Sequence, residues 1–171
     1  STNFRLKINN KNIIHTSTYK FTINALGIHN VLNATASIIA TKFVGVSNIS
    51  INRALTNYIG VERRFTFLGK INKALIYDDY AHHPTEILAT LDSAKTLLNN
   101  ITVVFQPHRY TRTKILMKEF VNALSKVNNL ILLETYPAGE KLIKGSTSKD
   151  LYRKILIRKK NVVFLNNLNN L

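Results

Sequence analysis

The sequence predicts an α/β protein whose C-terminal part is a Rossmann-like, mostly parallel sheet with a hairpin at its start. After Gly60, short apolar runs of strand length alternate with longer stretches of helix length, and repeated strand–helix units form parallel sheets through right-handed crossovers. Residues 1–60 offer only a few candidate strands and two helices, too little for an independent core. We therefore expect residues 1–60 to be the tail of a larger domain and residues 61–171 to be a separate domain.

The first 60 residues are expected to form strands followed by two helices. The strand-like runs are FRLKI, NIIHT and YKFTI, separated by Asn and Lys. The stretch from His29 to about Phe43 is too long for a strand and apolar around most of its circumference, which is typical of a buried helix. A second helix is expected near 50–58, after Ser47 and before Gly60, a residue type common just beyond helix ends.

The remaining residues predict a hairpin and then alternating helices and strands. RRFTFLG and KALIYDD, joined by GKIN, have the pattern of a hairpin. A helix should run from Pro84 to about Leu98, because proline is tolerated in the first turn. The unbroken apolar run ITVVFQ is typical of a strand covered on both faces. The further expected elements are a helix at about 111–125, the strand NLILLET, a helix from about 147 and the strand NVVFL.

Composition narrows the class of protein. The chain has no cysteine, which fits a reducing compartment. No apolar run reaches the ~20 residues of a membrane span, and the first residues lack a signal sequence, so we expect a cytoplasmic protein. The net charge of +15 makes a nucleic-acid-binding module an alternative. The lysines are dispersed, however, and Asn and Ile are also abundant, so we interpret the charge as general compositional drift and expect neither nucleic acid nor membrane as a partner.

Rare residue types gather in four short segments. Four of the five histidines and all three prolines lie in GIHNVLNATAS, YDDYAHHPTEI, FQPHRYTRT and ETYPAGE. The last three segments follow predicted strands, and α/β sheets bind ligands beyond the carboxyl ends of their strands. The pattern therefore predicts one site built from three loops.

Two arginines in this set predict an anion site. Arg109 and Arg112 are three residues apart at the start of a predicted helix, so both should lie on one face, where the helix terminus adds free N–H groups. Paired guanidinium groups suit a carboxylate or phosphate, and His108 would be a further donor. The alternative is a solvated basic helix start.

The other polar residues leave more than one interpretation open. His29 and Asn33 share a helix face and could be a core histidine with its neighbour or a contact to a purine. Asp78, Asp79, His82 and His83 could ligate a metal, as in a metal-dependent hydrolase. The strongly positive chain and the lack of a second ligand cluster favour hydrogen bonds to a polar substrate instead, so we expect no metal site. Glu134 and Glu140 could be structural.

Together with ERRF at 62–65, the four segments resemble, in order and approximate spacing, the UDP-N-acetylmuramate–L-alanine ligases of the Mur ligase family. The resemblance implies that residues 1–60 are the C-terminal part of the central ATP-binding domain. It implies that residues 61–171 are the C-terminal domain, possibly truncated. The implied reaction is the ATP-dependent ligation of L-alanine to UDP-N-acetylmuramate through an acyl phosphate, in peptidoglycan synthesis.

The resemblance also implies roles for individual residues. Those implied to contact ATP are His29, Asn33, Arg64, Asp78 and Asp79. Those implied to contact the other substrates are Tyr80, His82, His108, Arg109 and Arg112.

Other parts of the family pattern lie outside this sequence. No Gly-Lys-Thr or Gly-Lys-Ser phosphate loop occurs in the 171 residues, and Mg²⁺ is expected in the full-length enzyme with its ligands outside this chain. We therefore assign no catalytic residue and expect the chain alone to be inactive, with the upstream part of the ligase on the same or a separate chain.

Overall fold

The structure is a computed structural model that describes residues 2–9, 16–158 and 160–166. It divides into two compact units, Ser1–Asp79 and Tyr80–Leu171, and each is described here by itself. Among the described residues, no helix combines the length and apolar character needed to cross a membrane.

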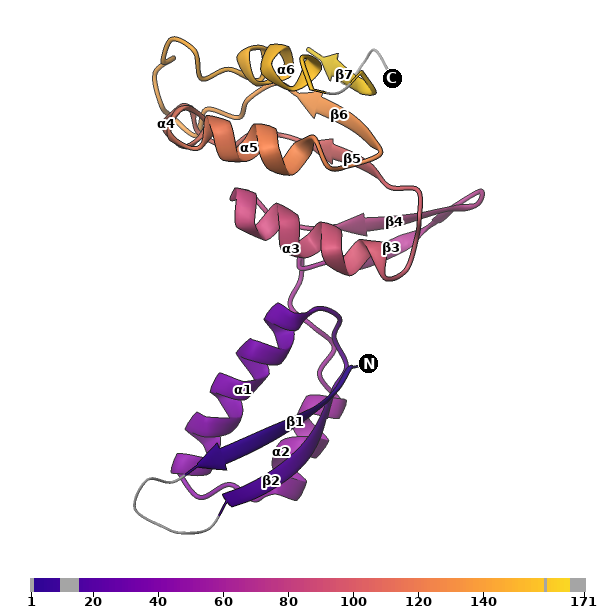
Figure 1. Ribbon diagram of the computed structural model, residues 1–171, viewed down its shortest axis with the longest axis vertical. Helices are drawn as coiled ribbons and strands as arrows, with labels where there is room; N and C mark the ends of the chain where they lie inside the picture. Colours follow the sequence, from indigo (N-terminus) through magenta and orange to yellow (C-terminus); the bar gives the residue numbers. More distant parts are fainter. Residues whose placement is uncertain (1, 10–15, 159, 167–171) are drawn as a thin grey trace. The chain divides into compact units, whose positions relative to one another are not determined.

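The first unit begins with an antiparallel strand pair and two helices (Figure 1). The elements are β1 (Thr2–Asn9), β2 (Thr16–Ile23), α1 (Ile28–Phe43) and α2 (Asn48–Thr56). The predicted run NIIHT lies outside the described residues apart from Thr16, which begins β2. Ser47 caps α2 by accepting a hydrogen bond from the Ser50 N–H at 3.2 Å, which confirms the predicted helix start.

The prediction that the first helix is buried is wrong for the described structure. Only Ala34 and Ile38 of α1 are buried, and Ile38 joins Phe21 and Ile51 in a small core. Ile28 and Phe43 are 72% and 92% exposed. One stripe of α1 is enough to cover the strand pair and α2, and Leu32 and Ile39 are exposed as well in the part of the chain that the structure describes.

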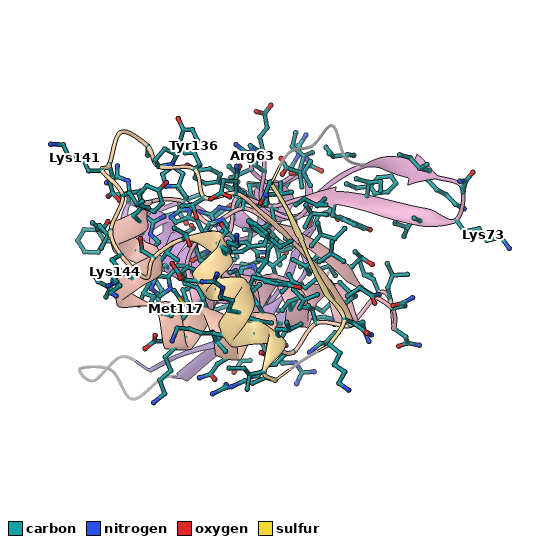
Figure 2. The ribbon with its side chains drawn as sticks, turned by 90° about the horizontal axis from the view of Figure 1, so that it is seen from above. Arg63, Lys73, Met117, Tyr136, Lys141 and Lys144 are labelled. Carbon is teal, nitrogen blue, oxygen red and sulfur yellow. The ribbon has the colours of Figure 1, made fainter. Side chains whose placement is uncertain are left out.

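A β-hairpin completes the first unit. It consists of β3 (Thr66–Ile71) and β4 (Ala74–Asp78). The turn is shorter than the predicted GKIN, because Gly69 to Ile71 still belong to β3, and Lys73 lies at the tip (Figure 2). The hairpin is confirmed, but within the described residues it forms its own two-stranded sheet and does not extend the parallel one.

The second unit is an α/β sandwich of helices on a parallel sheet. Its strands β5 (Thr102–Phe105), β6 (Asn129–Leu133) and β7 (Val162–Leu165) pair in the order β5-β6-β7, all parallel, as predicted. Its helices are α3 (Pro84–Lys95), α4 (Tyr110–Ile115), α5 (Met117–Leu124) and α6 (Ser148–Leu156). The single helix predicted at 111–125 is two, because Leu116, with φ −101° and ψ 22°, leaves the helical conformation.

The helices of the second unit cover one face of its sheet (Figure 1). The core on that face includes Phe120 and Leu124 of α5, Leu132 of β6 and Leu151 of α6. On the other face, Val104 and Val163 flank Ile131 in register and are 60% and 53% exposed. The prediction that ITVVFQ is covered on both faces is therefore wrong among the described elements. An apolar run shows that a strand can be covered, but not that a helix lies on its second face.

Candidate functional site

Three polar loops of the second unit meet in a row of aromatic rings. The centroid separations are 5.0 Å between Tyr80 and His82, 6.3 Å between His82 and His108, and 5.3 Å between His108 and Tyr136. These residues come from YDDYAHHPTEI, FQPHRYTRT and ETYPAGE. The structure thus brings together the three segments, as their positions after predicted strands indicated.

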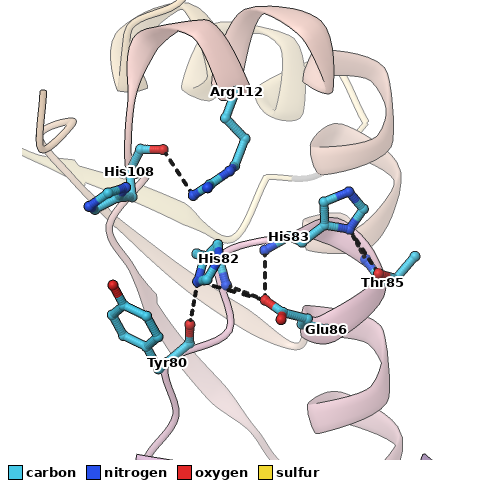
Figure 3. A network of polar contacts seen from close by, with 7 residues as sticks. All are labelled: Tyr80, His82, His83, Thr85, Glu86, His108 and Arg112. Carbon is cyan, nitrogen blue, oxygen red and sulfur yellow. Dashed lines mark hydrogen bonds and ion pairs between the residues drawn. The ribbon is translucent and has the colours of Figure 1, made fainter. Parts of the chain in front are cut away.

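The start of α3 determines where the two adjacent histidines point (Figure 3). His83 is the N-cap residue, and its Nδ1 accepts the Thr85 N–H at 3.3 Å. Glu86 accepts the backbone N–H groups of His82 and His83 at 3.0 and 3.2 Å, which completes a capping box. His83 therefore serves the helix, a role that the sequence interpretation of the histidine pair missed.

His82 is held in one tautomer when it is neutral. Its Nδ1 lies 2.9 Å from the Tyr80 carbonyl oxygen, which can only accept a hydrogen bond, so Nδ1 must carry the proton. Glu86 Oε2 lies 3.8 Å from the same nitrogen. The Nε2 atom of neutral His82 is consequently a hydrogen-bond acceptor.

His108 lies near two arginines and is biased toward its neutral form. Burial lowers the pKa of His108, and the positive charges of Arg112 and Arg109 lower it further, with a smaller contribution from His82. Its Nδ1 atom is buried and has no hydrogen-bond partner among the residues that the structure describes. The His108 imidazole thus lies within the electrostatic influence of both guanidinium groups of the predicted anion site.

The two arginines near His108 are positioned by different backbone conformations. Arg109 precedes α4 in a left-handed backbone conformation, φ 74°, its N–H donates to the Tyr136 carbonyl at 2.9 Å, and its guanidinium lies 4.0 Å from Glu140. Arg112, within α4, donates to the His108 carbonyl at 3.4 Å (Figure 3). Both arginines lie at the start of α4, as predicted.

The expectation of free N–H groups at this helix start needs a correction. Glu140 accepts the Thr111 N–H at 3.0 Å and the Thr111 hydroxyl at 2.7 Å. These hydrogen bonds are the main reason why the pKa of Glu140 lies below its ordinary value. The chain's own carboxylate therefore occupies a donor that was expected to serve a substrate. Only a weak sequence signal pointed to Glu140, because this residue lies far from Thr111 along the chain.

In the first unit, the two aspartates predicted to contact ATP bind a turn. Asp78 accepts from Arg63 Nε at 3.0 Å, and Asp79 accepts the Phe65 N–H at 2.9 Å. Arg63 and Phe65 have φ values of 57° and 52°, an uncommon conformation for residues other than glycine. Arg64 lies exposed within this turn. Both carboxylates thus stabilise the conformation that presents Arg64.

The remaining predicted ATP contacts lie on α1. His29 is only partly buried, so it is not a core histidine, and its Nε2 accepts from the Asn30 side-chain amide at 3.2 Å. Asn33 is exposed. Over the described ranges, no three His, Asp or Glu side chains gather in a group that could bind a metal ion.

Comparison with known proteins finds one family and several relatives. Residues 63–170 match the family described as Mur ligase, glutamate ligase domain. The chain is 46% identical over 145 residues to a UDP-N-acetylmuramate–L-alanine ligase of Methylococcus capsulatus, a match that covers 81% of this chain and 31% of the relative.

Two solved structures extend this result. A UDP-N-acetylmuramate–alanine ligase from Thermotoga maritima matches with a TM-score of 0.71 and 28% identity over 88% of this chain and 32% of that one. A murein peptide ligase from Psychrobacter arcticus matches with a TM-score of 0.66 and 27% identity over 98% of this chain and 34% of that one. The chain therefore spans about a third of the length of these relatives.

Proposed function

Since the chain belongs to the Mur ligase family, we propose that it takes part in the ATP-dependent ligation of L-alanine to UDP-N-acetylmuramate. The 46% identity over 145 residues to a UDP-N-acetylmuramate–L-alanine ligase supports alanine as the amino acid. In this reaction ATP phosphorylates the carboxylate of the sugar nucleotide, and the amine of alanine displaces phosphate to form the amide. The products are UDP-N-acetylmuramoyl-L-alanine, ADP and phosphate.

The observation that carries this proposal is the meeting of His82, His108, Arg109 and Arg112 at adjoining loops. An amino acid substrate presents a carboxylate beside its reacting amine. Guanidinium groups bind carboxylates with charge-assisted hydrogen bonds, so we assign Arg109 and Arg112 to the carboxylate of alanine. The amine is then placed toward the neighbouring imidazoles.

The arrangement of these imidazoles suits the amine step. An amine attacks the acyl phosphate carbon only after it has lost its ammonium proton, and the tetrahedral intermediate must lose a second proton before phosphate leaves. His82 offers Nε2 as an acceptor, and His108 is biased toward the neutral form. An imidazole nitrogen that can accept a hydrogen bond can take up such a proton, so we propose that His82 Nε2 receives it while the Tyr80 carbonyl holds the ring.

The ATP side is proposed for the first unit. His29 and Asn33 are proposed to contact the adenine. Arg64 in the 63–65 turn, and Asp78 and Asp79 that bind this turn, are proposed to contact ATP. The 171 residues contain no phosphate-loop motif, and the described residues offer no cluster for Mg²⁺, so no step of the reaction is assigned to a metal here. We propose that the groups aligning the γ-phosphate are supplied by the upstream part of the ligase, on the same or a separate chain.

A chimeric enzyme tests the proposal. The matching region of the Methylococcus capsulatus ligase is replaced by this chain, and product is followed by mass spectrometry with ATP, UDP-N-acetylmuramate and either L-alanine or a murein peptide. We expect UDP-N-acetylmuramoyl-L-alanine and stoichiometric ADP with L-alanine. A folded chimera that makes no amide with either, or that uses only the peptide, would overturn the proposal. The unmodified ligase is the positive control.

A further inference from the structure

Glu140 joins two loops that lie far apart in the sequence. Its carboxylate accepts two hydrogen bonds from Thr111, one from the N–H and one from the hydroxyl. The turn that presents it is closed by the Glu140 N–H, which donates to the Pro137 carbonyl at 3.0 Å, and contains Ala138 and Gly139 with left-handed φ values of 50° and 82°. The loop after β6 is thereby shaped to bring one carboxylate to the start of α4.

Arg109 lies between two attachments to that same loop. Before the side chain, the Arg109 N–H donates to the Tyr136 carbonyl at 2.9 Å. After it, Thr111 is bound to Glu140. The residue between has a φ of 74°, a conformation that a non-glycine residue keeps only where its surroundings impose it. Glu140 supplies one of the two restraints that impose it.

The Arg109 guanidinium is close to Glu140 but not locked to it. The nearest Arg109 nitrogen lies 4.0 Å from Oε1, beyond hydrogen-bond length, whereas the Thr111 hydroxyl lies 2.7 Å from that same oxygen. The carboxylate is therefore satisfied by Thr111 and still limits where the guanidinium can lie. The arginine keeps its donors for another carboxylate.

We propose that Glu140 is a positioning residue that fixes Arg109 for the carboxylate of the incoming amino acid. This inference rests on the proposed function, since it takes L-alanine as the ligand. Glu140 acts through Thr111 and the backbone of Arg109 and does not itself touch the substrate. The competing role, in which Glu140 binds the substrate ammonium directly, makes a different prediction for the amide variant.

The test compares Glu140→Gln and Glu140→Ala in the 171-residue chain. Glutamine keeps an oxygen acceptor for Thr111 but loses the charge, whereas alanine loses both. Glu119→Gln, an exposed acid on α5, is the matched control. L-alanine is titrated into each variant while NMR spectra record the Thr111 amide and the Arg109 side-chain Nε–H, and thermal melts check folding.

For a positioning role, Glu140→Ala should weaken L-alanine binding by about tenfold or more, the scale of one lost charge-assisted hydrogen bond. Glu140→Gln should retain most of the affinity, and Glu119→Gln should leave it unchanged. Equal losses in the Gln and Ala variants would overturn the inference in favour of direct ammonium binding. Unchanged affinity in Glu140→Ala would overturn it outright.

The spectra separate this inference from the proposed function. If the unsubstituted chain binds no L-alanine, the assignment of the ligand fails, and the Thr111 and Arg109 resonances still decide the positioning role. That role is supported if both resonances shift or broaden in a folded Glu140→Ala chain and stay near their places in Glu140→Gln. It is overturned if the Arg109 Nε–H resonance is the same in all variants.

Discussion

The imidazole rings of His82 and His108 lie 6.3 Å apart, centroid to centroid, although one precedes α3 and the other follows β5. Arg109 and Arg112 lie close enough to His108 to lower its pKa. The proposed amino acid site is therefore a small region in which two imidazoles and two guanidinium groups influence one another, and its parts can be tested separately.

The arginines should determine the use of L-alanine. In the chimeric enzyme, Arg109→Ala or Arg112→Ala should reduce kcat/KM for L-alanine by on the order of 2–4 kcal/mol of transition-state stabilisation, because a charge-assisted contact is lost. Steady-state kinetics measures this loss, and thermal melts should show little change. Lys118→Ala, which removes an exposed charge on α5, is the control. Unaltered kinetics in both arginine variants would exclude the carboxylate assignment.

His108 should titrate below the ordinary histidine pKa of 6.5. Because its pKa is lowered in the folded chain, the neutral form contributes stability that is fully present above pH 6.5 and is lost as the pH falls through the folded pKa. Histidine Cε1–H NMR titration measures this directly. In Arg112→Ala the pKa of His108 should rise, whereas Arg153→Ala, on α6, should not move it. A His108 pKa at or above 6.5 in the unsubstituted chain would contradict the structure.

The capping box of α3 should support both stability and His82. Glu86→Ala removes the acceptor of the His82 and His83 N–H groups and should cost about 1 kcal/mol in urea unfolding, as lost caps typically do. Glu86→Gln keeps an acceptor and should cost less. The His82 resonances should move in the Ala variant. If both variants unfold at the same urea concentration as the unsubstituted chain, the capping box contributes no free energy of unfolding.

A second capping box lies at α6. The Thr147 hydroxyl donates to the Asp150 carboxylate and accepts from the Asp150 N–H. Thr147→Ala removes both hydrogen bonds and should destabilise the chain by about 1 kcal/mol at neutral pH. The Thr147 hydroxyl is the main cause of the lowered pKa of Asp150. The contribution of the hydrogen bond from the Thr147 hydroxyl to the Asp150 carboxylate is therefore present above the ordinary value of 3.8 and disappears as the pH falls through the folded pKa. Urea unfolding at several pH values should show the variant and the unsubstituted chain converging in acid.

Local patterns predicted most elements but not what covers them. Ser47, Pro84 and Thr147 mark the starts of α2, α3 and α6 as their side chains predicted, because caps depend on a few neighbouring residues. The exposed sides of α1 and of the β5–β6–β7 sheet were predicted to be buried. Hydrophobic side chains indicate that a surface can be buried, but they do not indicate which element covers it.

The candidate site was predicted in outline for a similar reason. Clustered rare residues after strands identified the loops around His82 and His108. The role of His83 as a cap depends on the local backbone geometry at the start of α3. The role of Glu140 as the partner of Thr111 depends on a contact distant in sequence. Histidine is not a usual helix cap, and a glutamate's partner cannot be read from its own position in the sequence. The sequence pattern could therefore predict only polar chemistry at these residues.

The pairing between β5 and β6 continues beyond both strands, through the bridge of His108 with Tyr136. The Tyr136 backbone N–H donates to the Pro107 carbonyl at 2.9 Å, and the Tyr136 carbonyl accepts from the Arg109 N–H at the same distance. The two segments therefore stay hydrogen-bonded to each other beyond the ends of the strands, where loops usually diverge. An insertion or deletion of a single residue in one would put it out of step with its neighbour, so length changes here should be tolerated only in matched pairs.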